Sequence, residues 1–365
     1  MPATDAHLAL AQSLERAFEA WSEDPGPWSD ERFEAFALEA FALQFETNLP
    51  YGRYCRAVGR NPTTVRSWGE IPPAPSAAFR AVDLMVGDTA EAALRFRTSG
   101  TTGGRSSRGV HWIRRPATYR AALRGPFRHQ VLAGQDAARI LLIHEPFPSR
   151  GESSLAWMLD DVLSSFGAPG SERLDPSSGL SAAVVVRALE AAAAGRLPVV
   201  ILGTTLALAE LADLLARTDA EIPLPASSCV MDTGGAKGRP GLDRRLVMSR
   251  LLQRFALPGE AAVNEFGMTE LLSQRYGRGL AEPWLTGPPW LRTRVVDPVS
   301  LAPLPDGEDG LLCHYDLANV GSVVAVLTED RGRARGDTIQ WLGRTPGAMP
   351  RGCSLATAEL LEAQR

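Results

Sequence analysis

Between about residues 93 and 266, short apolar runs alternate with stretches of helical periodicity, and this alternation restricts the fold more than any other feature. The apolar runs predict buried strands at 93–98, 138–144, 197–203, 227–233 and 261–266. The intervening stretches predict helices at 153–166, 181–195, 205–217 and 242–256. Strands that alternate with helices form βαβ units, so the sequence predicts an α/β domain built on a largely parallel sheet.

The two flanks of this region have different patterns. Residues 1–80 carry apolar residues at three- and four-residue spacing, which predicts a helical N-terminal segment packed on the body, with Ser29 or Asp30 capping its second helix. After Pro283 the helical signal fades, and a final antiparallel or barrel-like portion is predicted from strands at 293–297, 310–315, 323–329 and 337–343. The predicted regions are therefore 1–80, an α/β domain at 81–345, and a short tail at 346–365.

Composition and charge exclude several classes of protein. Hydrophobic residues make up 45% and charged residues 22% of the chain, as in ordinary globular proteins, and the net charge of −4 argues against a nucleic-acid partner. The four cysteines are far apart without a C-x-x-C pair, which predicts free thiols in a reducing compartment. The first ten residues lack a secretory pattern, and the apolar segment 197–209 is too short for a membrane span. A cytoplasmic protein is expected.

A loop rich in glycine and hydroxyl residues follows the first predicted strand. Residues 98–107 contain three glycines and six serines or threonines. Glycines let successive backbone N–H groups point at one anion, and hydroxyls add donors for phosphate oxygens. The loop has no lysine and is therefore not a Walker A motif. From these residues alone, phosphate binding and a plain surface loop remain equally open.

Two later motifs carry groups that suit a nucleotide. The heptad Asn264–Glu270 (N-E-F-G-M-T-E) follows a predicted strand and combines an aromatic ring, a turn glycine, a hydroxyl and a carboxylate. Such groups can stack on a base, contact phosphate and bind Mg²⁺. Gly336-Asp337 is followed by Gly343-Arg344. A carboxylate at a strand start can accept both hydroxyls of a ribose, and a plain turn residue is the alternative for Asp337.

In this order and spacing, the motifs T-S-G-T-T-G (98–103), D-T-G-G (232–235), N-E-F-G-M-T-E, G-D and G-R resemble those of the adenylate-forming superfamily, which includes acyl-CoA synthetases. The resemblance runs from about residue 95 to 345. Within the superfamily, the chain is most similar to the acyl-protein synthetase (LuxE-type) family. That similarity rests on W-x-x-I-P-x-x-P at 68–75, T-G-G-x-K at 233–237, the stretch 316–330, and R-G-C-S-L at 351–355.

The resemblance implies the large-domain fold of adenylate-forming enzymes, with βαβ layers and a distorted β-barrel portion. It also implies a reaction with ATP and Mg²⁺ in which a carboxylate attacks the α-phosphorus and leaves an acyl-adenylate. Thr269 would contact the α-phosphate, Glu270 would hold Mg²⁺, Asp337 would bind the ribose, and Arg344 would lie near ribose or phosphate. The other implied ATP-binding residues are Thr98, Ser99, Gly100, Thr101, Thr102 and Gly103 at the β- and γ-phosphates, and Gly234, Gly235, Phe266 and Gly267 at the adenine.

The chain departs from the superfamily pattern in two places. Its phosphate loop carries Arg105, Ser106 and Ser107 where Pro-Lys is usual. Many members have a C-terminal swivelling domain whose lysine bridges the substrate carboxylate and the α-phosphate, but the 21 residues after Arg344 contain no lysine. We therefore expect the full swivelling domain to be absent. Lys237 is the chain's only lysine and the candidate catalytic substitute, with a solvated loop lysine as the alternative.

The tail carries a candidate nucleophile. Cys353 precedes a predicted short helix for which Ser354 is a candidate N-cap. A thiol at a helix N-terminus beside Arg351 is expected to have a lowered pKa. In the acyl-protein synthetase family a cysteine near the C-terminus accepts the acyl group, so the resemblance nominates Cys353 as the acyl acceptor. An unreactive thiol is the alternative.

Together these features predict an enzyme that activates a carboxylic acid, with a fatty acid as the expected class, and loads the acyl group onto Cys353. The thioester would then pass to a partner such as an acyl reductase. A compact acid–CoA ligase is one alternative, with CoA as the thiol. A non-catalytic nucleotide-binding subunit of an acyl reductase complex is the other.

Overall fold

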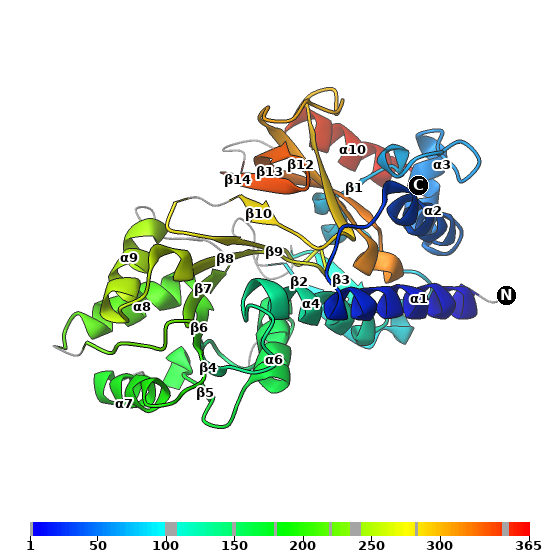
Figure 1. Ribbon diagram of the computed structural model, residues 1–365. Helices are drawn as coiled ribbons and strands as arrows, with labels where there is room; N and C mark the ends of the chain where they lie inside the picture. Colours follow the sequence, from blue (N-terminus) through cyan, green and yellow to red (C-terminus); the bar gives the residue numbers. More distant parts are fainter. Residues whose placement is uncertain are drawn as a thin grey trace. The chain divides into compact units, whose positions relative to one another are not determined.

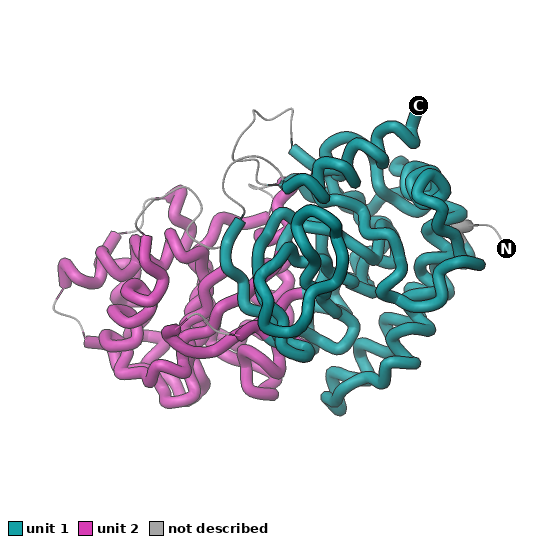
Figure 2. The backbone as a smooth tube through the Cα atoms, turned by 90° about the horizontal axis from the view of Figure 1, so that it is seen from above, with its two compact units in different colours: residues 1–125, 268–273, 286–365 teal, residues 126–267, 274–285 magenta. Residues whose placement is uncertain are grey.

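The computed structural model describes residues 3–98, 108–147, 151–178, 181–218, 221–233, 242–281, 284–344 and 350–365. The chain divides into two compact units, coloured separately in Figure 2. Unit 1 comprises Met1–Gly125, Met268–Ser273 and Thr286–Arg365, and unit 2 comprises Pro126–Gly267 and Gln274–Leu285. Each unit is described by itself below.

Unit 2 is built on a parallel sheet. Its strands run in the order β5 (Glu172–Arg173), β4 (Arg139–Ile143), β6 (Val199–Thr204), β7 (Cys229–Thr233) and β8 (Ala262–Phe266), and β9 (Arg275–Arg278) pairs antiparallel with β8. The helices of this unit are α6 (Ser154–Phe166), α7 (Ala182–Ala193), α8 (Thr205–Leu215) and α9 (Arg244–Arg254). Figure 1 shows α8 and α9 on one side of strands β6–β8 and α6 on the other. Covering on both faces explains why the residues of β6 and β7 are almost all buried.

Unit 1 combines helices with antiparallel strands. Strands β11 (Leu291–Val296), β12 (Gly310–Asp316), β13 (Ala325–Arg335) and β14 (Thr338–Arg344) form an antiparallel meander, and β1 (Ala74–Pro75) pairs in parallel with β13. A separate hairpin joins β2 (Leu94–Arg97) and β3 (Val110–Ile113). The helices are α1 (Ala3–Glu23), α2 (Asp30–Thr47), α3 (Leu49–Ala57) and α10 (Arg351–Glu362), with a short 3-10 helix η7 (Leu317–Gly321) after β12. The chain passes from unit 1 to unit 2 within helix α4 (Pro116–Gln130), and it passes back to unit 1 within β10 (Leu285–Thr286).

An aromatic cluster joins the first two helices of unit 1 to the start of its meander. Trp290 is fully buried, and its ring centroid lies 4.2 Å from that of Phe18 and 5.2 Å from that of Trp21. Trp28 lies 5.7 Å from Trp290. Large aromatic side chains bury much apolar area, so this cluster anchors α1 firmly. Helices α1 and α2 therefore share a core with the strands that follow residue 285.

The structure confirms the predicted α/β class and most of its elements. The five strands and four helices predicted between 93 and 266 are all present, with ends that differ by at most two residues. The strand predicted at 93–98 does not join the parallel sheet, however, because β2 pairs antiparallel with β3 in a separate hairpin. Ser29 caps α2, since its Oγ accepts a hydrogen bond from Arg32 N at 3.2 Å. Helices α3 and α4 and strands β3 and β9 were not predicted. Within the described ranges, every helix is too short or too polar to cross a bilayer.

Candidate functional site

The glycine- and hydroxyl-rich loop connects the two strands of the β2–β3 hairpin. Thr98 stands at its base, where Thr98 N donates to Gly109 O and Gly109 N donates to Thr98 Oγ1, each at 2.9 Å. The hairpin therefore holds the two ends of the loop together. The predicted phosphate-binding residues Ser99, Gly100, Thr101, Thr102 and Gly103 lie outside the described residues.

The turn at Met268–Ser273, here called the Glu270 turn, is held by its backbone carbonyls. Asn319 Nδ2 donates to Glu270 O at 2.8 Å, and His111 Nδ1 donates to Thr269 O at 2.8 Å. A carbonyl only accepts, so His111 carries its proton on Nδ1. Burial lowers the pKa of His111 to about 4, so the ring is neutral at pH 7.

A buried carboxylate holds the other end of the Glu270 turn. Asp316 Oδ2 accepts from Leu272 N and from Ser273 N, each at 2.9 Å, and Asp316 Oδ1 accepts from Ser273 Oγ at 2.7 Å and from Ala318 N at 3.0 Å. Burial raises the pKa of Asp316, and these hydrogen bonds oppose the rise because they favour the charged form. Sequence analysis missed His111, Asp316 and Asn319. The turn is thus fixed before any ligand arrives.

Glu270 is the carboxylate that the resemblance assigns to Mg²⁺, and its side chain is buried. In the part of the chain that the structure describes, no three or more His, Cys, Asp or Glu side chains are grouped to hold a metal. Proteins commonly hold Mg²⁺ through one or two carboxylates together with substrate phosphates. Glu270 therefore fits a magnesium ion that arrives with a nucleotide.

The two predicted ribose-side residues lie at opposite ends of β14. Asp337 is exposed in the tight turn before this strand, beside Gly336 with φ of +55°, and Arg344 is the last residue of the strand. Arg344 stands opposite Asp330 of β13, with Nε 3.4 Å from Asp330 Oδ1. Trp341 Nε1 also donates to that oxygen at 3.2 Å. Arg344 is thus paired with Asp330, which belongs to the stretch 316–330 that carries the family resemblance.

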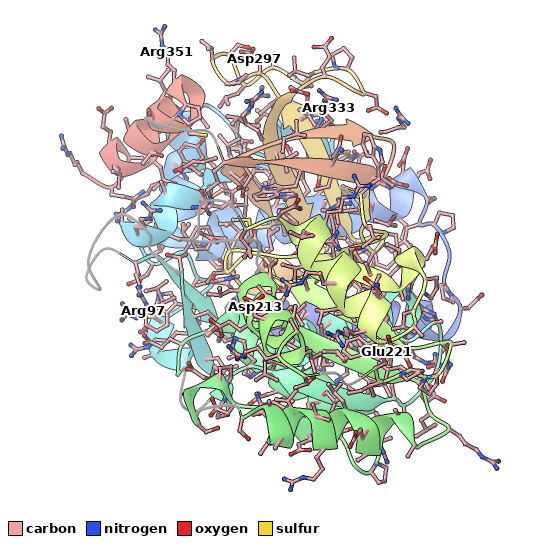
Figure 3. The ribbon with its side chains drawn as sticks, turned by 90° about the vertical axis from the view of Figure 1, so that its left-hand side faces the viewer. Arg97, Asp213, Glu221, Asp297, Arg333 and Arg351 are labelled. Carbon is pink, nitrogen blue, oxygen red and sulfur yellow. The ribbon has the colours of Figure 1, made fainter. Side chains whose placement is uncertain are left out.

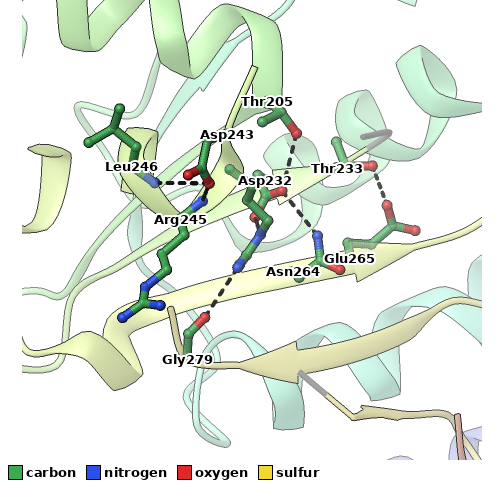
Figure 4. A network of polar contacts seen from close by, with 10 residues as sticks. Thr205, Asp232, Thr233, Asp243, Arg245, Leu246, Asn264, Glu265 and Gly279 are labelled. Atoms are coloured by element: carbon green, nitrogen blue, oxygen red, sulfur yellow. Dashed lines mark hydrogen bonds and ion pairs between the residues drawn. The ribbon is translucent and has the colours of Figure 1, made fainter. Parts of the chain in front are cut away.

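Polar side chains gather at the carboxyl end of the parallel sheet in unit 2 (Figure 4). Asp232 is fully buried at the end of β7 and accepts from Arg244 Nε at 2.8 Å, Asn264 Nδ2 at 3.0 Å and Thr205 Oγ1 at 3.2 Å. Burial raises the pKa of Asp232, and the charge of Arg244 opposes the rise. Ligands of α/β sheets bind at the carboxyl ends of the strands, which is where this cluster lies.

The predicted residue Gly267 follows the end of β8 and lies beside the carboxylate of Glu265. Thr233 Oγ1 donates to the carboxylate of Glu265, its neighbour across the β7–β8 ladder. A Cβ added to Gly267 would lie 2.6 Å from Glu265 Oε1, so a larger residue there would require that carboxylate to shift. Phe266 is half-buried at the last position of β8. The predicted residues Gly234, Gly235 and Lys237 lie outside the described residues.

The expected properties of Cys353 are wrong for this conformation. Helix α10 begins at Arg351 with Pro350 at its N-cap, so Ser354 lies inside the helix and is not the N-cap residue. Cys353 is 2% exposed, and its Sγ donates to Thr328 O of β13 at 3.5 Å. Burial and the charge of Glu329 raise the pKa of the thiol to about 12. Arg351 points outward from the start of α10 in Figure 3 and does not offset these effects.

The described members of the predicted site fall in both units. Unit 1 contains Thr98, Thr269, Glu270, Asp337, Arg344 and Cys353, and unit 2 contains Phe266 and Gly267. The buried carboxylate of Glu270, on a turn whose backbone is fixed, suits the binding of a charged, metal-carrying ligand. All four cysteines are free, as their spacing predicted, and all four are buried.

Two curated proteins are similar to a short part of the chain. The long-chain-fatty-acid–luciferin-component ligase of Vibrio harveyi is 31% identical over 84 residues, which are 21% of this chain and 22% of the relative. The ligase of the same name from Aliivibrio fischeri is 30% identical over 84 residues, which are 20% of this chain and 22% of the relative. The matched stretch therefore spans only about a fifth of these relatives. No protein-family model matches the chain.

Solved structures resemble the chain over most of its length. The structure of 2-hydroxyisobutyryl-CoA ligase in complex with 2-HIB-AMP and CoA has a TM-score of 0.62 and 17% sequence identity. The similarity covers 86% of this chain and 68% of that ligase. The chain thus has the α/β fold of this acid–CoA ligase, which confirms the fold that the sequence predicts.

Proposed function

We propose that this protein is an ATP- and Mg²⁺-dependent ligase that activates a carboxylic acid as its acyl-adenylate. The observation that carries the proposal is the rigidly held Glu270 turn, in a chain with the fold of an acid–CoA ligase. Acyl-adenylate formation needs preorganised donors and a metal at the developing charge more than it needs an acid or a base. A carboxylate on a fixed turn would hold that metal in place.

Several of the predicted residues have a proposed task in this reaction. Glu270 would hold Mg²⁺ and Thr269 would contact the α-phosphate, while the loop that begins at Thr98 would bind the outer phosphates. Mg²⁺, when bound, would neutralise phosphate charge and favour loss of pyrophosphate. Phe266 would stack on the base. For the ribose we propose Asp330 in place of Asp337, because Asp330 is the buried carboxylate beside Arg344.

We propose fatty acids as the acid class, because the curated relatives are named long-chain-fatty-acid ligases. We further propose Cys353 as the acyl acceptor, as in the acyl-protein synthetase family, with an acyl reductase as the partner that takes the group onward. Attack on the adenylate would form a C–S bond, release AMP and lose the thiol proton to solvent. An ATP-consuming reaction and free thiols also suit the cytoplasmic location that the sequence predicts.

One observation favours a second candidate. The Cys353 thiol is buried with a raised pKa, so it cannot attack an adenylate unless α10 leaves β13. CoA as the thiol would need no such movement. An acid–CoA ligase is therefore the rival function.

Acid-dependent ATP–pyrophosphate exchange tests the activation step. We expect exchange with at least one acid in a panel of fatty acids of graded length, and about 100-fold less in Glu270→Gln. Glu308→Gln, at an exposed position, is the matched control and should behave like wild type. No exchange with any acid would contradict the proposal and favour a non-catalytic nucleotide-binding subunit.

Intact mass after incubation with ATP and the active acid tests the acceptor. A hydroxylamine-sensitive acyl adduct on wild type that is lost in Cys353→Ser supports acyl transfer to this thiol. Cys55→Ser is the control, because Cys55 is also buried and burial also raises its pKa to about 12. Soluble acyl-CoA without any adduct would favour the rival ligase.

A further inference from the structure

The side-chain amide of a glutamine in α2 forms hydrogen bonds with backbone groups that are far away in the sequence but also lie in unit 1. Gln44 is fully buried, and its Nε2 donates to Asn319 O at 3.1 Å and to Val320 O at 3.2 Å. Its Oε1 accepts from Val324 N at 3.0 Å. The side chain therefore bridges the 3-10 helix η7 and the start of β13, about 275 residues away in the sequence. An apolar side chain of equal size would leave three buried backbone groups without these partners.

Asn319 continues this chain of contacts to the Glu270 turn. It lies in η7 with φ of −77° and ψ of 19°, outside helical values, and is fully buried. Its Nδ2 donates to Glu270 O at 2.8 Å and to Val323 O at 3.2 Å. Gln44 thus fixes the backbone of Asn319, and the side chain of Asn319 fixes the backbone of Glu270.

A second buried amide at the end of α2 reaches the same segment without touching the Glu270 turn. Asn48 Nδ2 donates to Ser322 O at 3.0 Å, and Asn48 Oδ1 accepts from Tyr51 N at 3.3 Å as the cap of α3. Ser322 Oγ donates onward to Leu84 O at 2.7 Å. Asn48 is fully buried, like Asn319, and so provides a matched comparison.

We propose that Gln44 and Asn319 are positioning residues through which helix α2 sets the place of Glu270. The inference rests on the proposed function, since it assigns these residues to the carboxylate that would hold Mg²⁺. It gives the N-terminal helices a task in nucleotide binding, although neither residue contacts a ligand in this proposal. Partners that orient a metal ligand typically change metal affinity 10- to 100-fold when removed.

Mg²⁺-dependent binding of ATP, measured by calorimetry at a series of Mg²⁺ concentrations, tests the proposal together with thermal unfolding. We expect Asn319→Ala to raise the Mg²⁺ concentration for half-maximal binding by about tenfold and Gln44→Met by about threefold. Asn48→Ala should lower the unfolding temperature about as much as Asn319→Ala does, but it should leave the Mg²⁺ concentration for half-maximal binding unchanged. Gln44→Met keeps the proposal testable if Asn319→Ala does not fold.

The outcomes separate this inference from the proposed function. Equal Mg²⁺ requirements in wild type, Gln44→Met and Asn48→Ala, with exchange activity intact, would overturn the positioning role alone. A raised requirement in Asn48→Ala as large as that in Asn319→Ala would also overturn it, because loss of stability would then explain both. A wild-type protein that binds no Mg²⁺ and ATP would overturn the proposed function and this inference together.

Discussion

The Glu270 turn and the Cys353 thiol are both buried in unit 1, but they are held by different forces. The turn is fixed by directional hydrogen bonds from His111 and Asn319 and by the carboxylate of Asp316. Cys353 has one weak S–H contact and lies on the buried face of α10 with Gly352, Ala356 and Leu360. Apolar burial is not directional, whereas a buried hydrogen bond is costly to break.

The difference matches the two tasks proposed for these groups. A metal ligand acts best where it already stands, because no reorganisation is then needed at the moment of reaction. An acyl-accepting thiol must reach the adenylate and afterwards a partner. Apart from polar contacts such as Gly352 N donating to Pro298 O at 2.9 Å, α10 packs through small and apolar residues, and such a helix can detach as a unit with few buried polar groups left unpaired.

The largest expected effect concerns the thiol. With its pKa raised to about 12 from an ordinary value of 9.0, Cys353 should be alkylated at pH 8 about 1,000-fold more slowly than an exposed thiol. Mass spectrometry after timed iodoacetamide treatment measures this rate. Rapid labelling of the native protein would show that α10 does not stay docked.

A substitution on α10 sharpens the same test. A Cβ at Gly352 would lie 2.5 Å from Leu301 Cδ2 and 3.0 Å from Pro298 O. Gly352→Val should therefore displace α10 and raise the rate at which Cys353 is alkylated. Leu355→Ala, at an exposed position of the same helix, is the control and should label as wild type does. Equal rates in all three proteins would contradict the packing argument.

A smaller effect is expected when the turn loses its carboxylate. Asp316→Ala removes the acceptor of three backbone N–H groups and one hydroxyl, and should lower the free energy of unfolding by about 3 kcal/mol. Urea unfolding followed by circular dichroism measures the change. Asp309→Ala, which removes an exposed ion-pair partner of Arg333, should have a much smaller effect. Similar losses in the two variants would mean that the turn is not held as described.

The smallest expected effect is a pH dependence. Because burial lowers the pKa of His111 to about 4 from 6.5, its contribution to stability is complete above pH 6.5 and is lost as the pH falls toward 4. The unfolded state binds one more proton in this window, which gives a slope of about 1.4 kcal/mol per pH unit. His111→Asn places an amide donor near the position of Nδ1 and does not titrate, so unfolding measured at pH 5 and 6 should show a shallower slope. An unchanged slope would contradict a neutral, buried ring.

The sequence predicted the elements with strong periodicity and missed those whose local signals conflict. Helix α4 contains Gly125 and Pro126, and helix α3 contains Gly52, which weaken a helical pattern that tertiary packing nevertheless supports. Asp330 was overlooked because the role proposed for it depends on its pairing with Arg344 across the hairpin, which no single strand reveals.

The candidate site was predictable only as far as its motifs are local. Thr269 and Glu270 were found from a contiguous heptad, but their supports Gln44, His111, Asp316 and Asn319 come from distant parts of the chain and follow no pattern. The pKa of Cys353 was misjudged for the same reason. The helix N-terminus is a local effect, and burial against β13 is a tertiary effect that outweighs it.

The packing of α10 on β13 also affects how easily the Cys353 thiol is oxidised. Peroxide attacks cysteine in proportion to its thiolate fraction and its access to solvent, and both are very low for Cys353 while the tail is docked. In this conformation the Cys353 thiol should therefore resist oxidation, and its oxidation would require α10 to leave β13 first.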